Sequence, residues 1–360
     1  MCLLNCTENQ TSLNSTQDRN CELYSESTSV RCIKALVYSL IMIISLCGNL
    51  AIIAIVLKNI RMWTTTNFLI ANMAASDLLI SVFAIPREFV FIFTGPERWL
   101  LDGLTGLILC KLVYFSQDIS TAVSIQSLVV VAIDRYRGVV FPFRPPLITT
   151  TRVLKVLIPI IWIVAMCIHG PYFYTARLTM QDNKWYCTFS WAPKFDPQRT
   201  QERYFIVISV FLIFLPLSVV LILYALILME LKKRKLKESG TLNRQRQRED
   251  AAIVKKILII VFLFALCITP LTVSAFVFYF AWNWHLPCGM GELFSAAKFI
   301  FYSNASLNPC VYISLSERYR QGLKDLINCL WSRRFHTDDI ELNVPSTTRS
   351  TSRQLTQQTR

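Results

Sequence analysis

Long apolar runs separated by short polar segments dominate this chain. We count seven runs of 20 residues or more, at about 34–58, 67–93, 107–133, 153–173, 204–231, 253–281 and 291–315. A helix rises 1.5 Å per residue, so about 20 apolar residues cross the hydrocarbon core of a bilayer. The runs are continuous rather than alternating, which favours helices over the strands of a barrel. The pattern therefore predicts an all-α membrane protein, a bundle of seven transmembrane helices.

The third run carries features that a lone helix in lipid would not need. The stretch from Cys110 to Pro142, which contains most of this run, has two charges, Asp134 and Arg135, where the apolar residues end. Gln117 and Ser124 are polar and lie seven positions apart, on about one face of a helix. We therefore expect other helices to surround this one.

The distribution of charge indicates the partner and the orientation. Only 17% of the residues are charged, against about 25% in soluble domains. The net charge of +14 could suggest nucleic acid, but 25 of the 37 lysines and arginines fall in 58–66, 135–155, 232–256 and the tail from 317. Such an excess marks the cytoplasmic side of a membrane protein. We expect a lipid bilayer and not nucleic acid as the partner, with the amino terminus outside and the carboxyl terminus inside.

The composition divides the chain into four regions. Residues 1–33 are rich in Ser, Thr and Asn, and we expect a disordered extracellular tail without a cleavable signal peptide. The bundle occupies 34–315. Residues 316–331 have an apolar stripe typical of an amphipathic helix at the membrane interface. Residues 332–360 are expected to form a disordered cytoplasmic tail with phosphorylatable Ser and Thr.

Four positions are candidates for covalent modification. Asn5, Asn9 and Asn14 each begin an Asn-x-Ser/Thr triplet on the side predicted to be extracellular, so we expect N-glycosylation. The alternative is a chance match in a biased segment. Cys329, near the end of the amphipathic helix, is a palmitoylation candidate, with a free cytosolic thiol as the alternative.

The twelve cysteines suggest a disulfide on the outer side. Cys110 begins the third run and Cys187 lies in the long loop after the fourth, both on the oxidising side. A bridge would close a loop of about 77 residues and stabilise the fold by up to ~4–5 kcal/mol. Cys32 and Cys288 are candidates for a second bridge. The pairing of Cys2, Cys6 and Cys21 stays open.

The loop at 174–203 contains a predicted β-hairpin. The strand-like runs YTARLTMQ and KWYCTFSW flank Asp182-Asn183, a turn signal. Tied to the third helix through Cys187, the hairpin would leave the mouth of a pocket open. An irregular loop is the alternative.

At this point the chain resembles the rhodopsin-like (class A) G-protein-coupled receptors over about residues 34–330. The motifs that carry the resemblance occur in order: Gly48-Asn49, Leu-Ile-Ala-Asn-Met-Ala-Ala-Ser-Asp77, Asp134-Arg135-Tyr136, Trp162, Pro216 with Tyr224, Phe264 with Cys267 and Pro270, and Asn308-Pro309-Cys310-Val311-Tyr312. Each motif alone is weak, but the ordered series is specific. The resemblance implies a plasma-membrane receptor with heterotrimeric G proteins, arrestin and receptor kinases as partners.

The resemblance also assigns roles at the cytoplasmic end. Arg135 would pair with Asp134 and, in the inactive state, with Asp250 at the foot of the sixth helix, so that the G protein competes for it. The other residues implied in coupling are Tyr136, Tyr224, Asn308, Pro309 and Tyr312. We expect Asp250→Ala to raise basal signalling, and equal basal activity at matched surface expression would count against this lock.

Two further clusters follow from the resemblance. Ile125, Pro216 and Phe264 match the packed connector between pocket and cytoplasm, and Ile268 stands where the family commonly has tryptophan. Asp77 is a carboxylate near mid-membrane, which costs at least ~2.5–3.5 kcal/mol unless compensated. The family surrounds it with the polar groups of Asn49, Ser124, Asn304 and Asn308, which implies an allosteric sodium ion. A water-filled polar cluster is the alternative, and no other cofactor is expected.

The third helix argues against two ligand classes. Amine receptors have aspartate at the position of Gln117, and Asp118 is turned about 100° from it. Opsins need a lysine at the position of Tyr302, and Lys298 lies one turn outward. The resemblance is closest to neuropeptide receptors of the RFamide, neuropeptide Y and galanin-like type. The candidate pocket residues are Phe115, Gln117, Asp118, Tyr279 and Tyr302.

Several outer acids could attract a basic peptide: Glu88, Glu97, Asp102, Asp182, Asp196, Glu202 and Glu292. A receptor for a lipid or small molecule, or a scavenging or arrestin-biased receptor, remains an alternative. A transporter would show paired repeats and broken helices, and the sequence has neither. An enzyme is not expected, because His169, His285 and His336 form no metal or nucleophile pattern.

Overall fold

The computed structural model describes residues 27–95, 98–141, 151–237, 241–287 and 289–341, with side chains except at 151–152, 235–250 and 330–341. The predicted glycosylation sites Asn5, Asn9 and Asn14 therefore lie outside the described residues. The same holds for the tail beyond 341.

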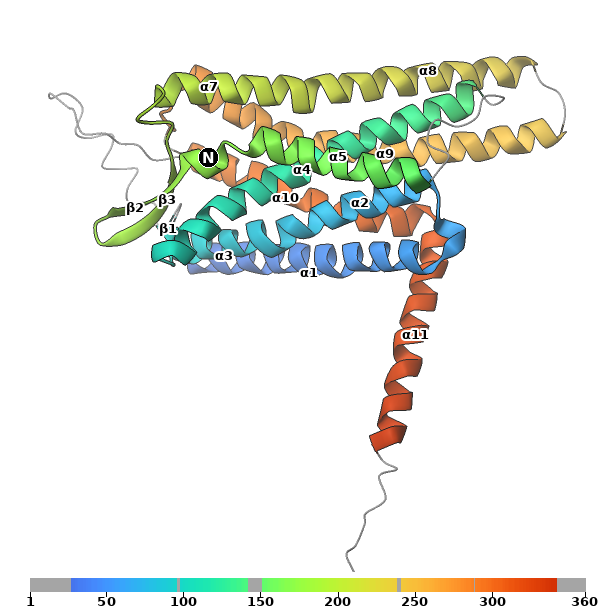
Figure 1. Ribbon diagram of the computed structural model, residues 1–360, viewed down its shortest axis with the longest axis horizontal. Coiled ribbons are helices and arrows are strands. Elements are labelled where there is room, and N and C mark those ends of the chain that lie inside the picture. The colour runs from blue at the N-terminus through green and yellow to red at the C-terminus, as the bar shows by residue number, and fades with distance from the viewer. Residues whose placement is uncertain (1–26, 96–97, 142–150, 238–240, 288, 342–360) are drawn as a thin grey trace, which may run out of the picture.

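Seven helical spans form an elongated bundle within the described residues (Figure 1). The first is α1 (Thr28–Lys58), the second joins α2 (Thr65–Leu79), η3 (Ile80–Ala84) and α3 (Ile85–Thr94), and the third is α4 (Gly103–Val140). The fourth is α5 (Thr151–His169), followed by the short α6 (Tyr172–Thr175). The fifth joins α7 (Pro197–Ile208), η4 (Ser209–Phe214) and α8 (Leu215–Lys237), the sixth joins α9 (Thr241–Phe276) and η5 (Val277–Ala281), and the seventh is α10 (Met290–Leu315). A short 3₁₀ turn, η2 (Ile60–Met62), lies in the first loop.

The first six spans are long and apolar enough to cross a membrane. The seventh, α10, has 26 residues and packs between α1 and α9. The seven predicted runs are thus confirmed as helices, and α4 lies in the middle of the bundle against α2, α5 and α8. This agrees with the polar face predicted for the third run.

Several helices extend beyond their apolar runs because caps, rather than hydrophobicity, end them. The Ser27 side chain accepts from the Val30 N–H at the start of α1. Asp196 accepts from the Arg199 N–H at 2.8 Å at the start of α7. Such caps satisfy the backbone donors that a helix start leaves open. The apolar run therefore marks the part of each helix in lipid, and the polar turns beyond it continue the same helix.

Two spans widen into π-helical turns just before a proline. The Ile85 N–H reaches the Ile80 carbonyl before Pro86, and the Leu215 N–H reaches the Val210 carbonyl before Pro216. Proline has no N–H and clashes with the carbonyl four residues back, so an i→i−5 turn accommodates it. These turns change the rotation per residue. Beyond them, the side of the helix on which a residue lies can no longer be predicted from a regular step of 100° per residue.

A glycine sets the distance between the first and seventh spans. A Cβ at Gly48 would lie 2.7 Å from both Cβ and Cγ of Pro309, closer than such atoms can approach. Gly48 therefore allows α1 to contact α10 at the Asn308-Pro309 motif.

We expect Gly48→Ala to destabilise the protein by about 1–3 kcal/mol, because the added methyl group overpacks this contact. Thermal unfolding of the purified protein in detergent measures the change. Gly138→Ala is the matched control: no atom lies within 4 Å of its Cβ position, so it should be neutral or stabilise the helix by up to ~1 kcal/mol. Equal effects of the two variants would contradict the close approach.

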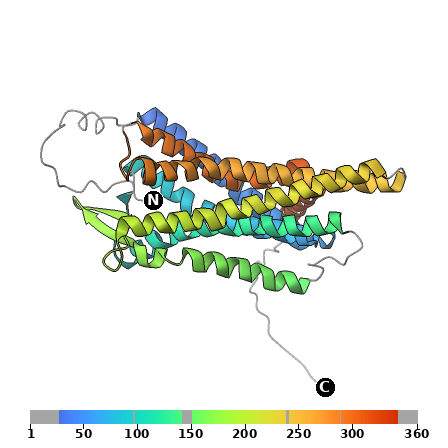
Figure 2. The same cartoon turned by 90° about the horizontal axis from the view of Figure 1, so that it is seen from above.

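One end of the bundle carries the predicted hairpin (Figures 1 and 2). β2 (Ala176–Gln181) and β3 (Lys184–Phe189) pair antiparallel, and β1 (Arg98–Trp99) adds to the free edge of β3. Asp182 and Asn183 form the turn with φ of 47° and 57°, which these residue types tolerate. The hairpin prediction is confirmed.

The hairpin is fixed to the third span by a disulfide. Cys110 in α4 and Cys187 in β3 are bonded, with Cα atoms 5.7 Å apart and both residues fully buried. The suggested second bridge is not formed: Cys32 is a free, exposed thiol, and Cys288 lies outside the described residues. Cys32 lies near the start of α1.

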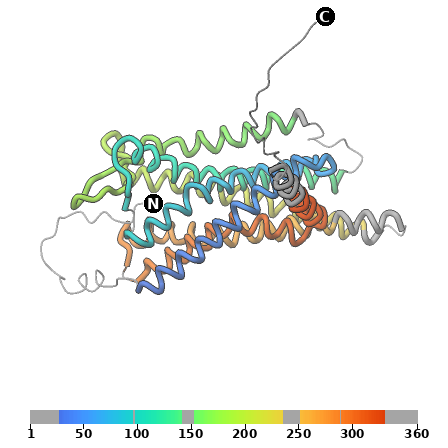
Figure 3. The backbone as a smooth tube through the Cα atoms, turned by 90° about the horizontal axis from the view of Figure 1, so that it is seen from below, coloured from blue at the N-terminus to red at the C-terminus, as the bar shows by residue number. Residues whose placement is uncertain are grey.

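At the opposite end α11 (Glu317–Glu341) turns away from the bundle axis (Figures 1 and 3). The helix continues ten residues past the predicted end at 331. Tyr319 anchors it, donating to Asn67 at 3.1 Å and packing against Tyr312. Burial raises the pKa of Tyr319 above its ordinary value, so the phenol stays neutral. Cys329 is exposed on this helix as a free thiol.

Candidate functional site

A cavity of about 790 Å³ lies at the hairpin end of the bundle. Its walls come from α3, α4, the end of α5, α7, η4, α9, η5 and α10, and from both strands of the hairpin. Gln181, at the end of β2, is exposed and also lines the cavity, so the cavity opens to the surface there. Its volume is in the upper part of the range of small-molecule sites, about 300–1,000 Å³.

Four of the five predicted pocket residues line this cavity: Gln117, Asp118, Tyr279 and Tyr302. The prediction for Phe115 is wrong. Its ring packs edge-on against Phe173, with centroids 4.7 Å apart. Two helical steps before Gln117 amount to about 200° of rotation, which places Phe115 on the other side of α4.

Asp118 lies closer to the cavity than the helical rotation suggested. It accepts a hydrogen bond from the Tyr172 hydroxyl at 2.5 Å, and its carboxylate is 3.9 Å from Nδ1 of buried His169. Asp118 thus lines the cavity as predicted although it is turned about 100° from Gln117, because the cavity is wide enough to be lined by adjacent positions of one helix. The argument against an amine ligand now rests on Gln117 and on the hydrogen bond that Asp118 already accepts.

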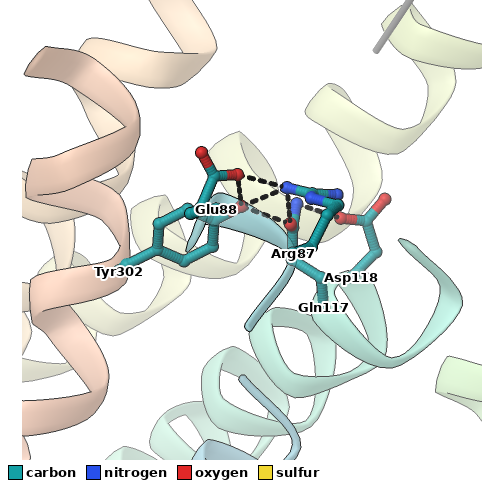
Figure 4. A network of polar contacts seen from close by, with 5 residues as sticks. All are labelled: Arg87, Glu88, Gln117, Asp118 and Tyr302. Atoms are coloured by element: carbon teal, nitrogen blue, oxygen red, sulfur yellow. Dashed lines mark hydrogen bonds and ion pairs between the residues drawn. The ribbon is translucent and has the colours of Figure 1, made fainter. Parts of the chain in front are cut away.

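The main feature that the sequence analysis missed is a buried charge pair in α3 (Figure 4). Nη2 of Arg87 lies 2.7 Å from Oε1 of Glu88, and the residues are 5% and 6% exposed. Nη2 is also 3.2 Å from Oε1 of Gln117 and 2.5 Å from the Tyr302 hydroxyl. That hydroxyl lies 3.1 Å from Glu88 and 2.7 Å from Gln117, so two predicted pocket residues belong to one network with the pair.

Glu88 was among the acids expected to face solvent and attract a peptide, and for Glu88 this is wrong. The sequence does contain a sign that Glu88 is buried, since it lies in an apolar run and next to an arginine. Charged residues in such runs almost always pair with one another inside the bundle. Of the other acids, Asp196 caps α7, Glu202 accepts from Trp284 at 2.8 Å, and Glu292 pairs with Lys34. Glu97 lies outside the described residues.

The mid-membrane polar residues come together only in part. Asn308 donates to Oδ2 of buried Asp77 at 2.8 Å. Asn49 instead donates to Ser45 and to the Ala305 carbonyl. The two other predicted members, Ser124 and Asn304, are also buried. The Ser124 hydroxyl is hydrogen-bonded to that of Ser76.

The predicted connector is packed below the cavity. Ile125, Phe264 and Ile268 are all buried in one apolar cluster, and Ile268 also lines the cavity. Pro216 follows the π turn η4 and is half-buried. Ile268 thus occupies the cavity floor, where it provides an aliphatic surface in place of an aromatic ring.

At the end of the bundle opposite the hairpin, Arg135 pairs with Asp134 at 2.7 Å, as expected. Tyr224 and Tyr312 are buried, and their hydroxyls have no hydrogen-bond partner among the described residues. Tyr136 is half-buried and packs edge-on against Phe141. The side chain of Asp250 lies outside the described residues, so the lock with Arg135 stays a prediction.

Seven spans, a disulfide-anchored hairpin over a deep cavity, and an Asp-Arg-Tyr triplet at the far end define a seven-helix membrane receptor. The comparison with known families agrees, because residues 48–312 match the model of the 7 transmembrane receptor (rhodopsin family). The chain belongs to this family, the G-protein-coupled receptors, and is a multi-pass membrane protein and not an enzyme.

The relatives include receptors named for substance K and substance P, which confirms the resemblance to neuropeptide receptors at this coarser level. The mouse substance-K receptor is 27% identical over 329 residues, covering 90% of this chain and 83% of the relative. The rat substance-P receptor is 28% identical over 297 residues, covering 82% of this chain and 70% of the relative.

Proposed function

We propose that the receptor binds an extracellular peptide in the hairpin-end cavity and activates heterotrimeric G proteins through the opposite end. The observation that carries this is the cavity itself, about 790 Å³ and open beside Gln181 of the hairpin. A peptide end can enter such a cavity while the rest of the peptide lies on β2 and β3. The relatives named for substance K and substance P, both tachykinin neuropeptides, support the same ligand class.

The proposed orientation places the hairpin outside and α11 inside. The oxidised Cys110–Cys187 pair and the clustering of basic residues in the loops of the other end support it. Arrestin and receptor kinases are proposed as further cytoplasmic partners. An epitope tag at the amino terminus should be accessible to antibody on intact cells, and a tag at the carboxyl terminus only after permeabilisation.

A library of synthetic neuropeptides, applied to cells that express the receptor with several G-protein reporters, tests the function. At least one peptide should give a saturable response, and Arg135→Ala should abolish it at equal surface expression. A response to lipids or amines but to no peptide would contradict the ligand class. A response through arrestin recruitment alone would contradict G-protein activation.

We propose that Asp77 binds an allosteric sodium ion. Oδ1 of Asp77 and Oδ1 of Asn49 are buried and have no hydrogen-bond partner among the described residues, so both remain available to a cation. Oxygen atoms are the ligands that hard cations prefer. Asn308, which donates to Oδ2 of Asp77, would orient the carboxylate.

Sodium should therefore weaken agonist binding in the wild type, and Asp77→Asn should remove this dependence because the neutral amide no longer attracts the ion. Competition binding of an active peptide in sodium chloride, against N-methyl-glucamine chloride of equal ionic strength, measures it. An unchanged sodium response in Asp77→Asn would refute the site and leave a hydrated polar cluster as the explanation.

A further inference from the structure

Three charged side chains, Arg87, Glu88 and Lys298, lie close together between α3 and α10. They differ in whether they line the cavity. Arg87 and Lys298 both line the cavity, whereas Glu88 does not. Glu88 sits behind Arg87 and interacts electrostatically with both cations. Two positive groups therefore share one carboxylate, and the surface that they present to the cavity is positive.

The arginine has donors to spare. A guanidinium carries five N–H groups, and Arg87 directs Nη2 to Glu88, Gln117 and Tyr302. Its Nε and Nη1 are buried and have no hydrogen-bond partner within the described chain. Leaving buried donors of a charged group unsatisfied is unfavourable, so these donors are suited to an acceptor that arrives with a ligand.

Aromatic rings hold the guanidinium in place. Its central carbon lies 4.3 Å from the centre of the Tyr114 ring and 5.3 Å from that of Phe91. The ammonium of Lys298 lies 5.5 Å from the Phe91 ring centre and makes no hydrogen bond or ion pair with the described residues. Both cations thus lie against Phe91, and the ring contacts limit the movement of the Arg87 guanidinium.

The anions of the cavity are, by contrast, already hydrogen-bonded. Asp118 accepts from the Tyr172 hydroxyl and Asp196 accepts from the Arg199 N–H. Among the charged residues of the described cavity wall, the unsatisfied hydrogen-bonding groups named here are therefore the donors of Arg87.

We propose that the Arg87–Lys298 side of the cavity binds a carboxylate of the ligand. The inference rests on the proposed peptide-receptor function and specifies the ligand as a peptide with a free carboxylate at the end that enters the cavity. A carboxylate oxygen can accept from an unsatisfied N–H of Arg87, and Lys298 adds a second positive charge. A carboxamide offers one acceptor, and its NH₂ group would face the cations.

Small probes test the site without a known agonist. Thermal unfolding of the purified full-length receptor in detergent is measured with roughly 20 mM sodium N-acetyl-phenylalaninate, its uncharged carboxamide, or sodium chloride. The carboxylate should raise Tm by about 2 °C or more over the salt control, as expected for a ligand that binds only the folded state, and the carboxamide should not. Equal shifts with the two probes would overturn the proposal.

Variants locate the effect. Lys298→Gln should abolish the carboxylate shift, as should the double variant Arg87→Gln/Glu88→Gln, which removes the guanidinium without leaving Glu88 as a buried lone charge. Lys34→Gln is the matched control, because Lys34 pairs with Glu292 and does not line the cavity. A shift that persists in both cavity variants would refute the site.

Peptide activity separates this inference from the proposed function. A peptide that is active in the reporter screen should lose about tenfold or more in potency in Lys298→Gln and little in Lys34→Gln. An active peptide of undiminished potency would overturn the carboxylate site and leave the peptide receptor intact. A receptor that binds the carboxylate probe but answers no peptide would contradict the peptide ligand while keeping the site.

Discussion

Replacing Arg87 by methionine should destabilise the receptor by about 3–5 kcal/mol. The change removes the ion-pair partner of the Glu88 carboxylate, 6% exposed, and leaves it with the Tyr302 hydroxyl as a neutral donor and with Lys298 as a charge that makes no ion pair with it. An uncompensated charge in such a site is the costly case, whereas the pair itself is nearly neutral in energy. Thermal or denaturant unfolding of the purified protein in detergent measures the loss.

Two further variants make this result specific. Arg87→Met/Glu88→Met should recover most of the stability, because no charge is left buried. Lys34→Met, which breaks the ion pair with the 56%-exposed Glu292 side chain at the rim, should cost no more than about 1 kcal/mol. If the double variant is as unstable as the single one, the destabilisation comes from lost packing and not from the lone carboxylate.

Cys110→Ser should be the second severe change. It opens the bond to Cys187, which closes a loop spanning 77 positions, and the chain-entropy model gives a loss of about 4–5 kcal/mol. It also frees β3 from α4, so that the cavity mouth loses its fixed edge. We expect strongly reduced surface expression, measured by antibody against an amino-terminal tag, and loss of peptide response in the receptors that remain.

The two cysteines should behave as one unit. Cys110→Ser, Cys187→Ser and the double variant should lose expression to the same extent, because each removes the same bond. Cys47→Ser, at a free exposed thiol in α1, should resemble the wild type. Additive losses in the double variant would mean that the cysteines act through separate packing contacts.

Much of the fold was predictable because the bilayer allows few solutions. Apolar runs of sufficient length must form helices there, since no water can satisfy an open backbone. The hairpin was also predictable, because its turn depends on local residue types. Asp182 and Asn183 both tolerate the positive φ that the turn requires. Helix ends were less predictable, since caps such as Ser27 lie beyond the apolar runs.

The errors in the site arose where a side chain's partners are distant in sequence. Arg87 meets Gln117 and Tyr302, which lie 30 and 215 positions further along the chain. The π turn at Ile80–Ala84 also lies between Asp77 and Arg87. A regular rotation of 100° per residue, counted from Asp77, therefore does not give the direction in which Arg87 points. The sequence also gave no sign that Asp118 accepts a hydrogen bond from Tyr172, which lies 54 positions further along the chain.

The sequence by itself determined the seven spans, the membrane orientation that we expect, the disulfide at Cys110 and the receptor family, because each depends on local chemistry or on the order of motifs. The tertiary structure alone decided that Arg87 and Lys298 face the cavity while Glu88 lies behind them. The physical reason is that a buried charge is stable only beside its partners. Those partners belong to helices whose relative rotation is set by packing and not by any single segment.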